Sequence, residues 1–294
     1  MNPFLTDDRT RLVYFGIPDP YTGKRPVFHL AGYGMGKQGV LLGTDPDGLE
    51  FPPIESLWSE SARQIGATYR DTVISRREVD IEAQVFGDTM REFRQRREQW
   101  FKAWSPRATG HLACFTRYNG WRWLGVRNQG QASPNWGKDP SLIRAAYFDM
   151  SIVADDPLWH TFQEKFLWTN AAQTGQGVIK IRNASEYEAH PKFYMPGPGK
   201  YSIQDGANGP MVELPELADG ETLAIDTHPQ RPTARVFSTE GGSDFTSVQK
   251  KMRGKRFRNP MQPWTSTELK VSVTGGSDVS QVYSVSSPRF DSPW

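Results

Sequence analysis

The sequence predicts a mainly β protein made of two domains. Short apolar runs alternate with polar residues along most of the 294 residues, and glycines and prolines separate these runs. Aromatic residues make up 12% of the chain, which also has 27 glycines and 22 prolines. Strands favour aromatic and β-branched residues, and turns need glycine and proline. This composition therefore favours many strands joined by turns over a helical bundle.

The bulk properties exclude several classes of protein. Apolar residues make up 37% of the chain and charged residues 23%, which is a globular composition. The net charge of +2 provides no global field for binding DNA or an acidic membrane. A single cysteine, Cys114, excludes an intramolecular disulfide and a cysteine-rich zinc site. We find no signal-peptide pattern and no apolar run long enough to span a membrane, so we expect assembly in a cytoplasm without membrane insertion.

Residues 76–86 form the clearest strand of the first half. Apolar and polar side chains alternate strictly along it, so one face should be buried and the other should meet water or a second subunit. The apolar set is Val79, Ile81, Ala83 and Val85. Shorter strands are predicted at residues 11–15 and 25–30, with glycine- and proline-rich loops over residues 32–53.

One helix is predicted, over residues 89–104. Gly87 ends the preceding strand, Asp88 can cap the helix, and the apolar period changes to between three and four residues. We expect the resulting stripe, which is mostly aromatic, to pack on the sheet of the first domain. The stripe consists of Met90, Phe93, Arg97, Trp100, Phe101 and Trp104.

A β-hairpin should follow the helix, and more strands fill the rest of the chain. Residues 111–117 and 121–127 flank Asn119-Gly120, a strong hairpin signal, and residues 144–154 alternate again. In the second half, regularly spaced short strands are typical of a β-sandwich. They cover residues 178–181, 192–195, 200–203, 211–214, 222–225, 235–238, 268–273 and 279–285. We expect domains at residues 1–165 and 166–294, the latter with an extended C-terminal tail.

Motifs that carry chemistry have better structural explanations. The Gly34-x-Gly36-x-x-Gly39 spacing matches a dinucleotide-binding loop, but no strand–helix context surrounds it, so an ordinary glycine-rich loop is favoured. Asp155, Asp156 and His160 could suggest a metal or an acid–base pair, but an aspartate–proline turn explains them better. Cys114 lies within an alternating strand and should be an inert thiol. We therefore expect no enzyme, no catalytic residue, no metal and no cofactor.

Positive charge gathers at two places. Residues 250–258 (KKMRGKRFR) could contact phosphates, but a solvated loop or a loop facing an acidic neighbour is favoured, since the whole chain is nearly neutral. The arginines off the helical stripe are free to meet a neighbour or to stay solvated. Candidate interface residues are Arg76, Arg77, Arg91, Arg94, Arg96, Lys250, Lys251 and Arg253.

Many aromatic residues in a β domain can also form stacking platforms for sugars. The tryptophan candidates are Trp121, Trp123, Trp136 and Trp264, although core packing is the favoured role for most of them. Tyr187, Tyr194 and Tyr201 also carry a polar tip, and most of these should be core or edge residues. A carbohydrate-binding module therefore remains the alternative function, with a glycan hydrolase as a third class that would need a paired carboxylate cleft.

The order of these segments resembles the distal tail proteins of long-tailed siphophages, especially the minor tail protein form in phages of actinobacteria. The resemblance is spread over most of the chain and is most specific in the second half, at Asn183, Pro191, Gly197-Pro198-Gly199 and Ile225-Asp226-Thr227-x-Pro229. The other matching segments are residues 32–42, 51–69, 76–104, 120–128, 148–160, 178–206 and 211–235.

The resemblance implies a structural subunit of the virion tail tip. The first domain would be a β-barrel or sandwich with one helix, related to tail-tube subunits, and six copies would close into a ring. The second domain would be a galectin-like β-sandwich that projects outward. The ring would join the tail tube protein to the baseplate hub, with the tape-measure protein ending in its lumen. Stable nucleic-acid binding is not expected.

Overall fold

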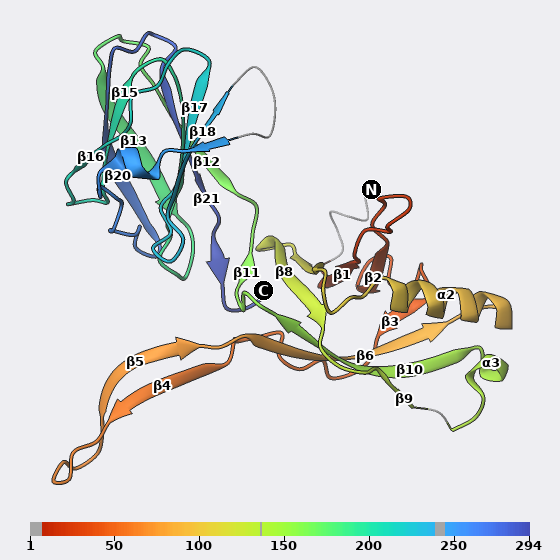
Figure 1. The fold of residues 1–294 in the computed structure, drawn as a ribbon. Coiled ribbons are helices and arrows are strands. Elements are labelled where there is room, and N and C mark those ends of the chain that lie inside the picture. Colours follow the sequence, from red (N-terminus) through yellow and green to blue (C-terminus); the bar gives the residue numbers. More distant parts are fainter. Residues whose placement is uncertain (1–7, 136, 239–244) are drawn as a thin grey trace. The chain divides into compact units, whose positions relative to one another are not determined.

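The computed structural model describes residues 8–135, 137–238 and 245–294, which form two compact units (Figure 1). The first unit comprises the chain up to Thr161 together with Phe290–Trp294, and the second comprises Phe162–Arg289. The division lies close to the boundary that the sequence predicts. The last five residues, however, belong to the first unit, whereas the sequence places them in a tail of the second domain.

The first unit is built around one large antiparallel sheet. Its main strands follow the order β2-β1-β7-β8-β10-β6-β3. The ends of this path lie next to each other, where the Gly36 amide donates to the His29 carbonyl oxygen at 3.0 Å, so the sheet is nearly a closed barrel. The strands are β1 (Arg11–Phe15), β2 (Val27–Ala31), β3 (Val40–Leu42), β6 (Arg77–Phe86), β7 (Gly110–Thr116), β8 (Gly120–Asn128) and β10 (Ala145–Ala154), with the short β9 (Ser133–Asn135), β11 (Trp159–His160) and β22 (Arg289–Phe290) attached.

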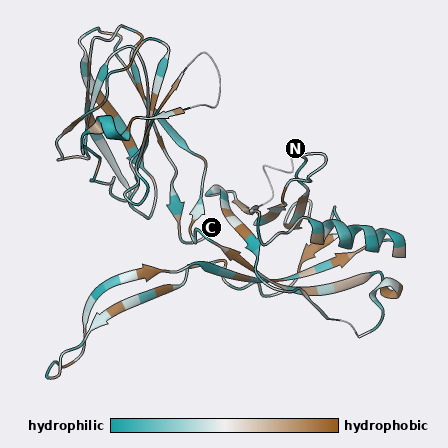
Figure 2. Cartoon of the chain, viewed as in Figure 1, coloured by the Kyte–Doolittle hydropathy of each residue, from teal (hydrophilic) through white to brown (hydrophobic). Residues whose placement is uncertain are grey.

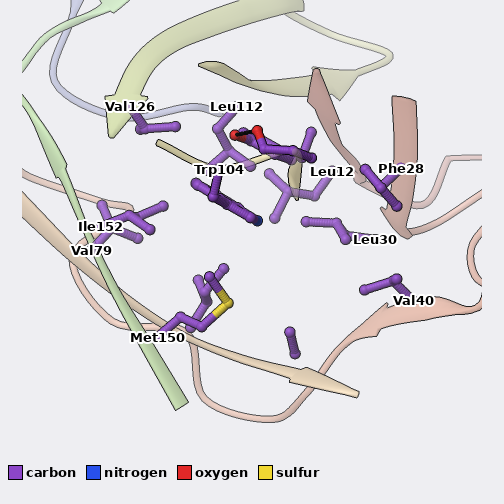
Figure 3. Close-up of a cluster of buried hydrophobic side chains, with 14 of the residues drawn as sticks. Leu12, Phe28, Leu30, Val40, Val79, Trp104, Leu112, Val126, Met150 and Ile152 are labelled. Atoms are coloured by element: carbon purple, nitrogen blue, oxygen red, sulfur yellow. Dashed lines mark hydrogen bonds between the residues drawn. The ribbon is translucent and has the colours of Figure 1, made fainter. Parts of the chain in front are cut away.

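The alternating strand predicted at residues 76–86 is confirmed as β6. Each predicted inward residue is buried, and β6 pairs with β10 in continuous antiparallel register from Arg77–Ala154 to Phe86–Ala145. Side chains from the surrounding strands and from the end of the helix meet in one core (Figure 3). The labelled members include Leu12, Phe28, Val79, Met150 and Ile152. Because one face of the pair is dry and the other is wet, the sequence pattern determines the register.

The predicted helix is α2 (Met90–Lys102), and two details of the prediction are wrong. Thr89, not Asp88, is the N-cap: its hydroxyl accepts from the Glu92 amide at 3.1 Å, while the Glu92 carboxylate accepts from the Asp88 amide. Met90, which the sequence places in the buried stripe, is 45% exposed. The aromatic members Phe93, Trp100 and Trp104 are buried and Phe101 is half-buried, as predicted, whereas Arg97 is exposed.

Trp100 is the centre of the helix–sheet packing. Its ring meets Tyr14 and Phe28 edge-on at centroid distances of 5.7 and 5.0 Å, and its indole N–H donates to the Met150 sulfur at 3.2 Å. Trp104 stacks flat on Tyr14 at 3.7 Å. These contacts attach α2 to strands that lie far away in the sequence. A second, short helix that the sequence does not predict, α3 (Pro140–Ile143), precedes β10.

The β7–β8 hairpin is confirmed with its predicted turn. Strand pairing runs from Gly110–Val126 to Thr116–Gly120. Gly120 has φ of +74°, a left-handed conformation that favours glycine. The Asn119-Gly120 signal therefore places the turn correctly.

The last segment of the chain packs on the first unit. The Arg122 guanidinium lies 3.9 Å from the centre of the Phe290 ring and donates to the Ser292 carbonyl oxygen at 2.6 Å. The Trp294 indole donates to the Glu50 carboxylate at 2.7 Å. Sequence periodicity cannot reveal these contacts, because they join residues far apart in the chain.

The second unit is a β-sandwich, as the short alternating strands predict. One sheet has the order β12-β21-β14-β17-β18-β19 and the other β13-β20-β15-β16. Their inner faces enclose a core that includes Phe193, Tyr201, Leu223 and Leu269. The strands are β12 (Glu164–Thr169), β13 (Gln176–Asn183), β14 (Lys192–Pro196), β15 (Lys200–Gln204), β16 (Met211–Glu213), β17 (Glu221–Asp226), β18 (Thr233–Ser238), β19 (Phe245–Ser247), β20 (Thr265–Thr274) and β21 (Gln281–Ser286), and the 3₁₀ turn η1 spans Gln249–Met252.

Candidate assembly surfaces

A two-stranded arm is the most conspicuous surface feature of the first unit. Strands β4 (Ile54–Ser59) and β5 (Thr68–Ile74) pair only with each other and extend away from the barrel strands (Figure 1). The alternation of residues along the chain does not predict these strands. The segment Thr68–Ile74 is rich in residues that favour strands, but its apolar residues do not alternate. Leu57 pairs with Asp71 and Trp58 with Tyr69, so the pairing register shifts by one residue within the arm.

Hydrophobic residues lie on both strands of the arm (Figure 2), and their side chains are exposed. Trp58 and Tyr69 face each other with their rings edge-on at 5.6 Å, yet they are 58% and 52% exposed. Isolated two-stranded ribbons are marginally stable in water, and contiguous exposed apolar groups usually mark an interface. The other exposed members are Phe51, Ile54, Leu57, Ile65 and Val73.

The outward face of the β6–β10 pair is acidic. Glu82 lies directly opposite Asp149, and Asp80 lies opposite Ser151, whose hydroxyl donates to it. Like charges in directly opposite positions weaken a strand pair. The loop before β4 adds Asp45 and Asp47 to the same face. Asp45 and Asp80 line one shallow hollow, and the backbone of Asp47 pairs with that of Asp80 in an isolated antiparallel β-bridge.

Arg76 and Arg77 are both predicted interface residues, but they have different environments. Arg76 is exposed and pairs with Glu78 at 3.0 Å, and the hydrogen bonds from Gln129 and Arg76 hold the pKa of the Glu78 carboxyl below its usual value. Arg77 is 0% exposed. The prediction for Arg77 is wrong, because its guanidinium lies inside the unit and donates to carbonyl oxygens.

The acceptors explain why Arg77 is buried. Its Nη1 donates to the carbonyl oxygens of Gly48, Leu49 and Glu50 at 2.8–2.9 Å, and its Nε donates to that of Pro157 at 2.7 Å. These bonds join the loop before β4 to the turn after β10. Arg77 therefore fixes the base of the arm, a structural role that the sequence pattern does not indicate.

The helix arginines also differ in how free they are. Arg96 pairs with Glu92 at 2.6 Å, donates to the Phe86 carbonyl oxygen at 3.1 Å and lies over the Phe86 ring, so it attaches α2 to β6. Arg94 makes one long hydrogen bond, of 3.3 Å, to the Ser141 hydroxyl, and Arg91 is exposed. Of the three candidate arginines, Arg91 and Arg94 present a guanidinium that is largely available to a neighbour.

In the second unit, Lys250 and Lys251 lie on η1 and Arg253 lies directly after it, all three exposed.

The aromatic residues considered for sugar stacking differ in how exposed they are. Trp121 and Trp123 are half-buried and stack on each other at 5.7 Å, Trp264 is 64% exposed, and Trp136 lies outside the described residues. Tyr201 is buried, but Tyr194 and Tyr283 are exposed neighbours on the outer face of the larger sheet.

The motifs considered for chemistry have structural roles. Gly34, Gly36 and Gly39 all have positive φ and form turns that lead into strand β3. Asp155 pairs with Arg127 at 2.9 Å and Asp156 with His160 at 3.1 Å. Burial raises the pKa of the Cys114 thiol to about 12.

None of the described helices has the length and apolar character needed to cross a membrane. Residues 8–135, 137–238 and 245–294 contain no group of three or more histidine, cysteine, aspartate or glutamate side chains placed to hold a metal ion.

Comparison with known proteins identifies tail proteins of phages. No family model matches the chain. Minor tail protein Gp27 of Mycobacterium phage D29 is 25% identical over 318 residues, covering 88% of this chain and 92% of the relative. The corresponding protein of Mycobacterium phage L5 is 23% identical with the same coverage.

Solved structures show the same fold at low sequence identity. The Dit protein of phage SPP1, described as a paradigm of the hub adsorption apparatus in phages that infect Gram-positive bacteria, has a TM-score of 0.64 at 14% identity, covering 96% of this chain and 99% of that one. A chain of the activated phage P2 baseplate has a TM-score of 0.58 at 9% identity, covering 97% and 99%. The chain is thus a homologue of mycobacteriophage minor tail proteins and has the fold of the Dit distal tail proteins.

Proposed function

We propose that six copies of this chain form a ring that joins the tail tube to the baseplate hub. Homology to minor tail proteins supports a structural role in a phage tail, and the non-enzymatic character of the chain is part of the same proposal. The first unit would form the ring and the second would face the surrounding tail-tip proteins. Tail tube protein, tape-measure protein and hub proteins would be the partners, in a virion assembled in the host cytoplasm.

The observation that carries the ring is the arm. A β4–β5 ribbon without its own core gains free energy when its apolar side chains are covered, at about 25 cal/mol per Å² of apolar surface. A second copy can supply that cover. A contact between two different surfaces of neighbouring copies closes into a ring when the rotation between them fits.

The acidic face of β6–β10 suits the lumen of such a ring. Glu82 and Asp149 place like charges opposite each other, which gives no stability to the isolated chain. A negative wall would repel the phosphates of DNA as they pass through. This assignment agrees with the expectation that the polar face of β6 meets water or a second subunit.

The solution mass of the full chain tests the proposal. We expect a species of about six times the 33.3 kDa of one chain by light scattering. Replacing both Leu57 and Trp58 with serine should shift the mass toward one chain without lowering the unfolding temperature. Tyr118→Ser removes an even more exposed aromatic from the β7–β8 turn and should keep the large species. A stable monomer of the unmodified chain at high concentration would overturn the ring.

Carbohydrate binding is the second candidate, favoured by one observation in the second unit. Leu167, Tyr283 and Tyr194 lie side by side across β12, β21 and β14, and each is at least 36% exposed. Tyrosines in such a row can stack on sugar rings. Sugar binding also needs polar groups that converge on a hollow, and a flat row of side chains does not provide them, so we expect no measurable affinity for host cell-wall polysaccharide. Millimolar or tighter binding that Tyr194→Ala and Tyr283→Ala abolish would support the binding module instead.

A further inference from the structure

A short loop of the second unit carries six positive charges in a fixed arrangement. We name residues 248–259 the cationic loop; it contains η1 and the turn after it. Its charged members are Lys250, Lys251, Arg253, Lys255, Arg256 and Arg258, and all of them are exposed. The question is whether these charges are scattered on a flexible segment or are held in place.

Apolar residues anchor the loop at three points. Val248 and Met252 are buried in the core of the sandwich, and Phe257 packs on Phe193 at a centroid distance of 5.3 Å. The Val248 amide donates to the Ala234 carbonyl oxygen of β18 at 2.9 Å. The anchors therefore attach the loop to the sandwich, and the cations between them project into solvent.

A buried carboxylate holds the second half of the loop. Asp205 is 3% exposed and accepts from the backbone amides of Arg258 and Asn259 at 2.9 and 3.0 Å. The Asn259 side-chain amide also donates to the Asp205 backbone and side-chain oxygens at 3.0 Å. Asp205 thus fixes the backbone of the loop and does not face its cations.

Most of the charges have no anionic partner within the described residues. Lys255 pairs with Glu213 at 2.8 Å, and Lys200 lies 3.6 Å from the same carboxylate. The other five cations of the loop form no ion pair with any residue that the structure describes. An ordered surface of like charges repels itself, and an anionic partner would relieve this repulsion without having to order the loop first.

We propose that the cationic loop is a docking surface for a carboxylate-rich segment of another tail-tip protein. The chain as a whole carries a net charge of only +2, whereas domains that bind nucleic acid are strongly basic. The choice of a polypeptide partner rests on the proposed place of the chain in the tail tip. Arginine and lysine together suit aspartate and glutamate side chains, which they contact through charge-assisted hydrogen bonds.

Binding of the full chain to a labelled oligoglutamate tests this proposal. We expect binding at low salt that weakens at physiological salt. Neutralising three charges together (Lys250→Gln, Lys251→Gln, Arg256→Gln) should weaken it about tenfold, since each exposed ion pair contributes a few tenths of a kcal/mol or more. Removing the same charge at exposed strand positions outside the loop (Lys165→Gln, Lys180→Gln, Lys270→Gln) should change it less than about twofold.

Three outcomes would overturn the docking surface. They are equal losses in the two triple variants, no preference of the unmodified chain for oligoglutamate over oligoglutamine, and polyphosphate of equal charge binding more than about tenfold more tightly than oligoglutamate. The last would assign the loop to a phosphate polymer. Measuring the solution mass of the same variants separates this test from the ring: a missing ring with intact oligoglutamate binding contradicts only the ring.

Discussion

The β6–β10 pair and the β4–β5 arm are both antiparallel strand pairs of the first unit, but only the first has a core. Val79 and Ile152 face each other across β6–β10 and are fully buried. Trp58 and Tyr69 face each other across the arm and are more than half exposed. Strand pairing alone therefore does not show where a strand gains its stability. The burial of its side chains separates the part that folds the chain from the part we assign to assembly.

The largest expected effect belongs to the core side of this comparison. Trp100→Ala removes the ring between Tyr14, Phe28 and Met150, and should lower the free energy of unfolding of the first unit by about 3–5 kcal/mol. Met90→Ala, on the exposed first turn of the same helix, should lower it by less than about 1 kcal/mol. Chemical denaturation measures both. Equal effects of the two changes would mean that α2 does not pack through Trp100.

Arg77 tests the junction between core and arm. Arg77→Met leaves the carbonyl oxygens of Gly48, Leu49 and Glu50 without their donor, and should lower the free energy of unfolding by about 3 kcal/mol. Arg76→Met breaks one exposed ion pair with Glu78 and should cost less than about 1 kcal/mol. The structural role of Arg77 is contradicted if the two arginines tolerate methionine equally well.

Arg94 and Arg96 sharpen the distinction between assembly and stability on one helix. Arg94→Glu should reduce ring formation several-fold and leave the unfolding temperature unchanged, because its own contact in the chain is one long hydrogen bond. Arg96→Glu should lower the unfolding temperature, since it breaks the pair with Glu92 and the bond to Phe86. Light scattering measures ring formation, and thermal melting measures the unfolding temperature. An unchanged six-chain mass for Arg94→Glu would place Arg94 on a solvated face.

The smallest expected effect is a pH dependence of the stability of the two units, which the arm does not share. Burial lowers the pKa of His190, helped by the charge of His228, and burial also lowers the pKa of His111 and His29. A histidine with a depressed pKa binds fewer protons when folded. Its contribution to stability is therefore complete above the unfolded pKa of about 6.5 and is lost as the pH falls below it.

Thermal melting between neutral pH and about pH 5.5 should thus show a lower unfolding temperature at the acidic end. Residues 51–74 contain no histidine, so the mass of the ring should not change over the same range. His190→Gln should reduce the pH dependence of the second unit. A ring that dissociates before either unit loses stability would contradict the separation of assembly from folding.

Local patterns in the sequence predict the elements that have one buried face. The alternation of β6, the Asn119-Gly120 turn, the strands of the sandwich and the Phe93–Trp100 stripe are visible because burial imposes a period on the residues. Alternation cannot predict the arm, since residues that are exposed on both faces of a strand need not alternate. The burial of Arg77 is not predicted for a different reason. Its acceptors are backbone carbonyl oxygens, which every residue has, so no residue type in the sequence indicates them.

The candidate surfaces were only partly predictable. Lys250, Lys251 and Arg253 are exposed as expected, because a dense charge run cannot be buried without partners. Charge alone did not distinguish Arg94 from Arg96, which differ in the contacts made by α2 with Ser141 and Phe86. Those contacts depend on where the helix lies on the sheet, which the sequence pattern does not specify.

Hydrogen exchange of the arm amides tests the central claim most directly. In a dilute, monomeric sample the amides of Ile54–Ser59 and Thr68–Ile74 should exchange quickly, because a ribbon without a core opens readily. In a concentrated sample that contains the ring they should become as protected as those of β6 and β10, whose protection should not change with concentration. Arm amides that exchange equally fast in both samples, with the ring present, would contradict the assignment of the arm to assembly.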